Sequence, residues 1–136
     1  MQTCAQAQEA LETYFAQWIQ DLEPVVSEFG PEGATLDIPI TDHVTRFGGI
    51  ISGQALAALA DTAMVFACAG HFGAFKPVAT TNLDTQFLRP GSGDMIRCRA
   101  RVVRAGKSLV FAEAEMTSLP SDKAVARATA TFFLPS

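Results

Sequence analysis

Residues 50–70, which read IISGQALAALADTAMVFACAG, decide the fold of this chain. Apolar side chains would point in nearly every direction around such a helix, a pattern typical of a helix that is buried on all sides. Gly48-Gly49 breaks the chain before this stretch, and Gly70 suits the left-handed residue that closes a helix. We therefore predict a central helix over residues 50–70.

One carboxylate, Asp61, interrupts this apolar stretch. An ionised carboxylate in apolar surroundings is costly, so it must shift its pKa or find hydrogen-bond donors. Two interpretations remain open. Asp61 is either a functional group kept in the core for chemistry, or a structural acceptor of hydrogen bonds from a neighbouring backbone amide or from Thr62, Thr80 or Thr81.

The segments before the central helix predict a covering helix and one strand. Within residues 1–24, apolar side chains recur at helical spacing on one face, and Thr3 with Gln6 resembles a capping box. Residues 36–40 alternate apolar and polar side chains, as a strand does, and Pro39 favours a place near an edge or an end of the sheet.

The C-terminal part, residues 78–134, predicts four strands joined by short turns. Short turns indicate antiparallel pairing, because parallel strands need long crossovers. The apolar face of such a sheet needs a cover, and the central helix is the only segment apolar enough to supply it. We expect an α+β fold, an antiparallel sheet wrapped around the central helix, as a single domain over residues 1–136.

Alternation also predicts which side chains share a face of the sheet. Along the first strand of this part, one side is expected to hold Ala79, Thr81, Leu83, Thr85 and Phe87. On the next strands, charged side chains are placed to pair across the sheet as a solvated surface, with Arg97, Arg99 and Arg101 opposite Glu113, Glu115 and Arg127. Nucleic acid is not an expected partner, because the net charge is −4 and no aromatic side chains interleave with these arginines.

Cysteines and histidines do not predict a metal site or a disulfide framework. The three cysteines have no metal-ligand spacing, and His43 and His71 are isolated. Glu9 and Glu12 interrupt any apolar region near the N-terminus that a signal peptide would need. Since the central stretch is short for a membrane span and contains Asp61, we expect a cytoplasmic protein without a membrane partner.

Gly53 and Asp61 form a candidate pair for chemistry on a carbonyl group. The free N–H groups at a helix start can bind an oxyanion, and the carboxylate can act as a base or nucleophile. At about 1.5 Å of rise per residue, the two positions lie roughly 12 Å apart, too far to act on one carbonyl carbon. If both act, they come from two copies of the chain with antiparallel central helices, so catalysis would need a homodimer.

Several motifs together resemble those of hotdog-fold acyl-CoA thioesterases of the phenylacetate-degradation (PaaI-like) group. The resemblance spans residues 36–136 and is carried by the stretch from Gly49 to Ala63, Thr80-Thr81-Asn82-Leu83, Phe87-Leu88-Arg89-Pro90, Gly93-Asp94, Gly106-Lys107, and Ala126 to Phe132. It implies a hotdog fold that pairs into dimers, usually forms tetramers, and needs no cofactor beyond its CoA thioester substrate.

The resemblance also implies roles for particular residues. Asp61 would act as nucleophile or general base, Gly53 of the partner chain would supply an oxyanion-hole N–H, and Thr80 would orient the water. Contacts to the substrate or to CoA would come from Ser52, Gln54, Arg46, Thr81, Arg89 and Lys107.

This chain departs from the family pattern at the start of the central helix. Ser52-Gly53-Gln54 stands where the family often has His-Gly-Gly, and Arg46 stands where it often has Asn. The function expected is hydrolysis of acyl-CoA or aryl-CoA thioesters. Because the His and Asn are absent, the alternative is an acyl-CoA binding module without catalysis, and a hydratase or dehydratase of acyl thioesters is a third option.

Overall fold

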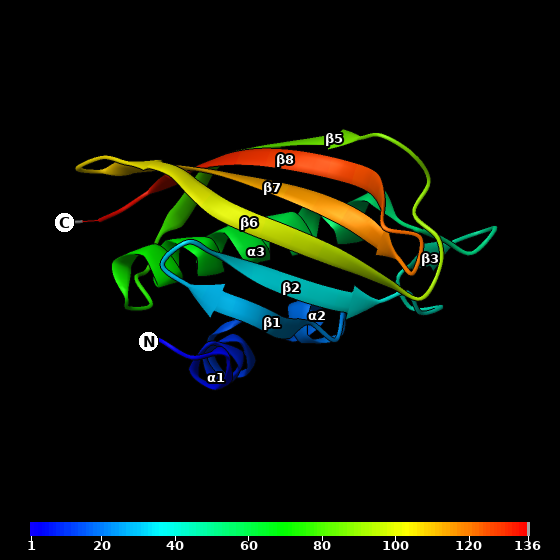
Figure 1. Cartoon of the computed structure of the whole chain (residues 1–136), viewed down its shortest axis with the longest axis horizontal. Helices are drawn as coiled ribbons and strands as arrows, with labels where there is room; N and C mark the ends of the chain where they lie inside the picture. Colours follow the sequence, from blue (N-terminus) through cyan, green and yellow to red (C-terminus); the bar gives the residue numbers. More distant parts are fainter. Residues whose placement is uncertain (136) are drawn as a thin grey trace.

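The computed structural model describes residues 1–135, in which a six-stranded antiparallel sheet curves around one long helix (Figure 1). The sheet order is β1-β2-β6-β7-β8-β5. Its strands are β1 (Val25–Gly30), β2 (Gly33–Pro39), β5 (Ala79–Phe87), β6 (Met95–Ala105), β7 (Leu109–Leu119) and β8 (Lys123–Phe133). The predicted α+β architecture is confirmed.

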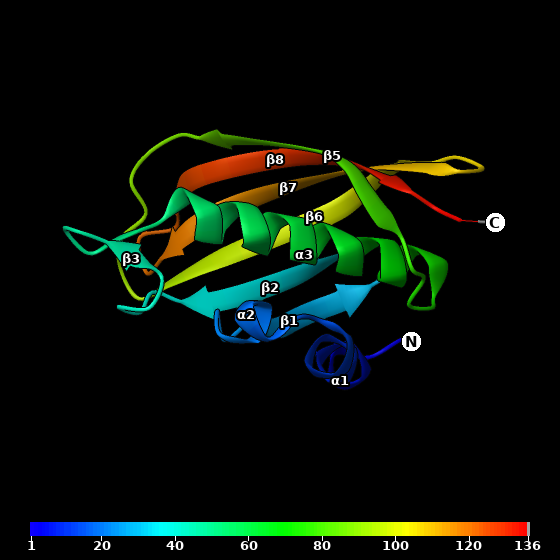
Figure 2. The ribbon, with the colours of Figure 1, turned by 180° about the vertical axis from the view of Figure 1, so that it is seen from behind.

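The central helix α3 (Gly53–Phe72) lies across the concave face of this sheet, as Figure 2 shows. Its side chains Leu59, Met64 and Phe66 are buried, as are sheet residues such as Ile96 and Phe132. α3 is long and apolar enough to cross a bilayer by length and composition, so the expectation that it is too short was wrong. However, 72% of that apolar window is buried inside the fold.

The end of α3 differs from the prediction. The helix continues past Gly70 to Phe72, and Gly73 is the left-handed residue that closes it, with φ of 72°. Gly70 is instead needed because the helix passes directly over β1: a Cβ at this position would collide with the carbonyl oxygen of Gly30. The start also differs, because Ile50 and Ile51 form the short strand β4 (Ile50–Ile51) rather than helix.

The N-terminal region is not one continuous helix. α1 (Cys4–Tyr14) begins at the predicted capping box, in which Thr3 and Gln6 bond reciprocally, and stops at Phe15, which has extended backbone angles. A single short turn, α2 (Gln17–Gln20), follows. α1 packs beside β1, at the lower edge of the sheet in both ribbon views.

Besides β4, two further strands before α3 were not predicted. β1 occupies the edge of the sheet, so β2 lies between β1 and β6, and Pro39 is the last residue of β2. The segment without clear periodicity contains β3 (Thr45–Arg46), which pairs with β4 in a small hairpin ahead of α3. A strand of two residues is too short to show alternation in sequence.

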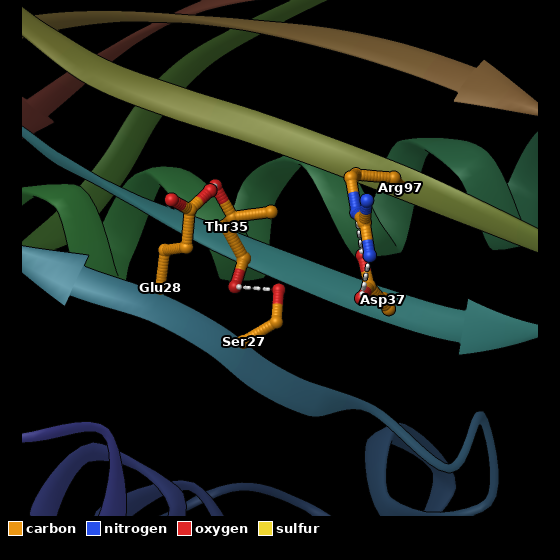
Figure 3. A network of polar contacts seen from close by, with 5 residues as sticks. All are labelled: Ser27, Glu28, Thr35, Asp37 and Arg97. Atoms are coloured by element: carbon orange, nitrogen blue, oxygen red, sulfur yellow. Dashed lines mark hydrogen bonds and ion pairs between the residues drawn. The ribbon is translucent and has the colours of Figure 1, made fainter. Parts of the chain in front are cut away.

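The outer face of the sheet carries the predicted charged pairs, with one difference. Arg101 forms an ion pair with Glu113, and Arg99, Glu115 and Arg127 lie in one cross-strand row. Arg97, however, binds Asp37 of β2 through two hydrogen bonds of 2.9 and 3.0 Å, drawn in Figure 3 with the neighbouring Ser27, Glu28 and Thr35. This bidentate pair ties β2 to β6 away from the helix side.

Candidate active site

Asp61 meets one of its predicted partners, Thr80. Asp61 lies in the middle of α3, and Thr80 lies near the start of β5, the strand at the edge of the sheet. The Thr80 hydroxyl donates a hydrogen bond of 2.9 Å to Oδ1 of Asp61. The two residues are 19 positions apart in sequence, and the fold brings them together because β5 returns beside the helix.

Burial and a hydrogen bond shift the pKa of Asp61 in opposite directions. Removal from water raises the pKa of this carboxyl group above its ordinary value, because the charged form loses hydration. The hydrogen bond from Thr80 opposes this effect and lowers the pKa, since it stabilises the ionised form. A partly desolvated carboxylate with a raised pKa is a stronger base than a free one, which suits proton abstraction from water.

A β-bulge determines which threonine faces the helix. The pairing of β5 with β8 shifts between Thr80 and Asn82, so Thr80 lies opposite Phe132 and Leu83 lies opposite Ala130, both buried beneath the sheet. The extra residue, Thr81, donates its hydroxyl to the carbonyl of Thr131, at 3.1 Å. The expectation that Ala79 and Thr81 share a face with Leu83, Thr85 and Phe87 is therefore wrong, because a bulge shifts the alternation by one residue.

The start of α3 leaves two donors free. Ser52 is the N-cap, and its hydroxyl accepts a hydrogen bond of 3.2 Å from the N–H of Ala55. Among the hydrogen bonds of residues 1–135, none engages the N–H of Gly53 or Gln54. Unbonded N–H groups at the positive end of a helix can stabilise the negative oxygen that develops on an attacked carbonyl.

Phe87, which was not predicted to belong to the site, covers this helix start. A Cβ built on Gly53 would lie 3.3 Å from Cζ and 3.4 Å from Cε1 of the Phe87 ring. The residue Phe87 is nevertheless 55% exposed. The sequence placed Phe87 on one face of the sheet with Leu83 and Thr85, but no sequence feature indicated contact with Gly53.

The two halves of the candidate site remain apart within one chain. Gly53 and Asp61 are eight residues apart on a continuous α-helix, which corresponds to about 12 Å along the axis. A carbonyl carbon bound at the N–H of Gly53 therefore cannot be attacked by a water held on Asp61 of the same helix. The geometric argument made from the sequence applies to the folded chain, because α3 is unbroken between these residues.

The other predicted contact residues lie near the helix start or far from it. Gln54 is exposed on the first turn of α3, and Arg46 lies on β3 with its guanidinium 5.3 Å from the centre of the Phe47 ring. Arg89 follows the end of β5, whereas Lys107 lies in the β6–β7 turn, at the opposite end of the sheet (Figure 2). One chain does not bring Arg89 and Lys107 together.

Two hollows on the chain lie away from Asp61. One, of about 640 Å³, is lined by the β1–β2 turn and by outer-face residues such as Arg99 and Glu115. The other, of about 280 Å³, is lined by outer-face residues of β5, β7 and β8. Neither is lined by Asp61, Thr80 or Gly53. No group of three or more His, Cys, Asp or Glu side chains within residues 1–135 could hold a metal ion.

Comparison with known proteins connects this geometry to a family. The family model described as the thioesterase superfamily matches residues 48–125, which contain α3 and strands β5 to β7. A presumed esterase of Thermoplasma acidophilum is 29% identical over 108 residues, covering 77% of this chain and 80% of that protein.

Solved structures share the whole fold. A conserved protein of Pseudomonas aeruginosa is 28% identical, with a TM-score of 0.83 over 93% of this chain and 99% of that one. A thioesterase of Haemophilus influenzae has a TM-score of 0.88 at 17% identity, covering all of this chain and 92% of that chain. The zebrafish thioesterase superfamily member 2 has a TM-score of 0.86 at 18% identity, covering 99% and 100%.

Proposed function

The chain belongs to the thioesterase superfamily, and we propose that it hydrolyses acyl-CoA or aryl-CoA thioesters to the free acid and CoA. Membership supports thioester hydrolysis in general, and the CoA thioester is our proposal. The observation that carries it is the pairing of a partly buried carboxylate, Asp61, with Thr80, together with the free N–H groups of Gly53 and Gln54 at the start of the same helix.

The proposed chemistry uses these groups in two roles. Ionised Asp61 takes a proton from a water molecule as the water oxygen attacks the thioester carbonyl carbon, or it attacks that carbon directly. Thr80 orients the carboxylate and the water. The carbonyl oxygen becomes an oxyanion that accepts hydrogen bonds from the Gly53 and Gln54 N–H groups. As the oxyanion collapses, the carbon–sulfur bond breaks, and on the water route the leaving thiolate takes the proton held by Asp61 to become the CoA thiol. On the direct route, water then hydrolyses the acyl–Asp61 anhydride, which gives the free acid, restores the carboxylate and supplies the proton of the thiol.

This mechanism requires two copies of the chain. Because Gly53 and Asp61 of one helix are separated by about 12 Å, the oxyanion donors must come from a second copy whose α3 runs antiparallel to the first. Two surfaces support such a homodimer. The first half of α3 leaves Gln54, Ala57, Ala58 and Asp61 incompletely buried, and β5 has no strand on its outer edge within the described residues.

Placement of the basic side chains supports CoA binding at the helix start. Arg46 of the β3–β4 hairpin and Arg89 after β5 both lie at that end of α3, where the N–H of Ile51 bonds to the carbonyl of Gly91. Lys107 belongs to the β6–β7 turn, which lies at the other end of the sheet, and it would reach the same CoA only from another copy. The tetramer and the PaaI-like subgroup stay predictions.

An acyl-CoA binding module without catalysis is the second candidate. The observation that favours it is the capping role of Ser52, whose hydroxyl accepts the Ala55 N–H, at the position where the family often has a histidine. A hydratase is less well supported, since His71 is ten residues beyond Asp61, about 15 Å along α3.

Substitution Asp61→Asn tests the proposal. We expect a loss of thiol release of about 100-fold or more across a panel of alkyl and aryl CoA thioesters, because a general base contributes roughly that factor. The Asn side chain can still accept the Thr80 hydroxyl, so the fold should persist. Asp84→Asn, an exposed change on the same edge strand, is the matched control and should leave the rate unchanged.

Two results would contradict parts of this proposal. Equal rates for Asp61→Asn and the wild-type chain would remove Asp61 from the mechanism. Saturable CoA binding with no thiol release by the wild-type chain would favour the binding module. Sedimentation of the wild-type chain tests the two-copy requirement, and an active monomer would overturn it.

A further inference from the structure

The ring of Phe87 occupies a position from which it can select among acyl groups. It stands against the α carbon of Gly53, within van der Waals reach of where a side chain would begin. The Gly53 N–H is bonded to that same α carbon and has no acceptor in the described chain. The apolar ring and the free donor therefore border the same small region of space.

The backbone fixes Phe87 although its ring is exposed. Phe87 pairs with Ala126 of β8, and the N–H of the next residue, Leu88, donates to the carbonyl of Val125 at 2.9 Å. On the preceding residue, Gln86, the side-chain carbonyl accepts a hydrogen bond of 2.6 Å from Arg127. The attachment point of the ring is thus held from both sides, while Phe87 is more than half exposed in the single chain.

Packing within the chain does not explain why a large aromatic side chain stands at position 87. An aromatic side chain contributes to stability mainly by the area that it removes from water, and Phe87 leaves most of that area exposed. Phe132, by comparison, is fully buried on the neighbouring strand. A large apolar side chain whose backbone is fixed, whose surface is left open, and which lies beside unbonded donors has the properties of a wall for a bound apolar group.

We infer that Phe87 is a specificity-determining residue of the thioester site, one that limits the bulk of the acyl group next to the carbonyl carbon. This inference rests on the proposed function. When a thioester oxygen is held by the Gly53 N–H, the carbon atoms adjacent to the carbonyl must pass beside the ring tip. A straight chain fits alongside the ring, whereas a branch or an aromatic ring at this position collides with it.

The same strand then serves both halves of the site. Thr80 near one end of β5 bonds to Asp61, and Phe87 at the other end covers Gly53. In a two-copy site, Phe87 and Gly53 come from one chain, and the Asp61 and Thr80 that act with them come from the second copy. The wall for the acyl group is therefore supplied together with the oxyanion donors.

The test compares acyl preferences rather than overall rates. Values of kcat/KM are measured for butyryl-CoA and for the branched or aryl isobutyryl-CoA and benzoyl-CoA, with wild type, Phe87→Ala, Phe87→Leu and Phe87→Trp. We expect Phe87→Ala to raise the preference for the bulky thioesters by about tenfold or more, the scale set by small steric changes in a binding pocket. Leucine should give an intermediate preference, and tryptophan should strengthen the bias towards butyryl-CoA.

A matched control separates this role from a structural one. Phe111→Ala removes another partly exposed phenylalanine, on the outer side of the sheet, and should leave the preference unchanged. If Phe87→Ala lowered all rates by the same factor, or changed none, the inference would be overturned. Circular dichroism of each variant shows whether it folds. If Phe87→Ala does not fold, the leucine and tryptophan variants, which keep a large side chain at this position, still test the preference.

Failure of the proposed function can be distinguished from failure of the inference about Phe87. If the wild-type chain releases no thiol from any thioester, hydrolysis is wrong, and the preference is measured instead as Kd for butyryl-CoA, isobutyryl-CoA and benzoyl-CoA by calorimetry. A shift towards the bulky ligands in Phe87→Ala would then support the inference without catalysis. The inference would be overturned if wild type and Phe87→Ala had the same relative affinities for the three ligands, or if neither bound any of them.

Discussion

Before the exposed His71 and the half-buried Phe72 that end it, α3 divides into two nine-residue halves that are both rich in small and apolar residues but have different surroundings. In the second half, residues 62–70, every residue except Val65 is buried. In the first half, residues 53–61, Gly53, Gln54, Ala57, Ala58 and Asp61 are not. We call these the closed half and the open half. The asymmetry shows that a helix apolar nearly all round need not be covered all round by its own chain.

The closed half anchors the helix to the fold. Phe66 packs against Phe15 of the N-terminal region, Phe29 of β1 and Phe75 after the helix, with ring centroids 5.4, 6.5 and 5.8 Å away. Gly70 lets the helix approach the backbone of Gly30. The open half carries Asp61 and the free donors, so the groups proposed for chemistry lie where the chain leaves room for a substrate and a second copy.

The largest effect is expected in the closed half, from Gly70→Ala. The added methyl collides with the carbonyl of Gly30, which is backbone and cannot rotate away. Overpacking of this kind costs about 1–3 kcal/mol, and the clash here favours the upper end even after alanine's better helix propensity is counted. Chemical denaturation should show this loss in the free energy of unfolding.

Gly30→Ala is the matched control for that contact. It adds a methyl at the other partner of the same close approach, but that methyl would meet no atom within 4 Å. Its stability should stay within about 0.5 kcal/mol of wild type, as surface substitutions usually do. Equal losses in the two variants would show that the closed half is not held by this approach.

Within the open half, Thr80→Val should change the pH dependence of activity. Burial raises the pKa of Asp61 and the Thr80 hydroxyl lowers it, so removing the hydroxyl should raise the pKa further. Activity needs the ionised carboxylate, so it should rise with pH through this pKa, and the midpoint of kcat/KM should move to higher pH in the variant. An unchanged or lower midpoint would exclude Asp61 as the titrating group.

The stability of the fold should fall as pH rises through the pKa of Asp61, whereas activity should rise. A carboxyl group whose pKa is raised by folding stabilises the folded state while protonated, and that contribution is lost as pH rises through the raised pKa. Asp61→Asn stays neutral, so at neutral pH it should be as stable as wild type or more stable while losing activity. Thermal unfolding at several pH values measures this, and clear destabilisation at neutral pH would mean that Asp61 is a structural acceptor.

The smallest effect on stability is expected at the start of the open half, from Gly53→Ala. The new methyl would touch only the tip of the exposed Phe87 ring, which can move by a few tenths of an ångström. We expect a change in unfolding free energy below about 0.5 kcal/mol, as at most surface sites. A loss as large as that of Gly70→Ala would erase the distinction between the halves.

Several features of the fold were predictable because they depend on local pattern. The apolar run around Asp61 required a buried helix, the capping box at Thr3 marked the start of α1, and regular alternation after residue 78 required antiparallel strands. The bulge at Thr81 was not predictable, because its extra residue is visible only when β8 is paired beside β5. For the same reason, sequence alone left three threonines as possible partners of Asp61.

The sequence by itself therefore determined the helix, the antiparallel sheet, the lone carboxylate and its distance from the helix start, since each follows from residue type and chain geometry. Only the tertiary structure decided which half of α3 stays open, which threonine bonds to Asp61, and which ring covers Gly53. Those outcomes depend on contacts between residues far apart in the chain, including 19 positions between Asp61 and Thr80. Such contacts exist only once the strands have taken their register around the helix.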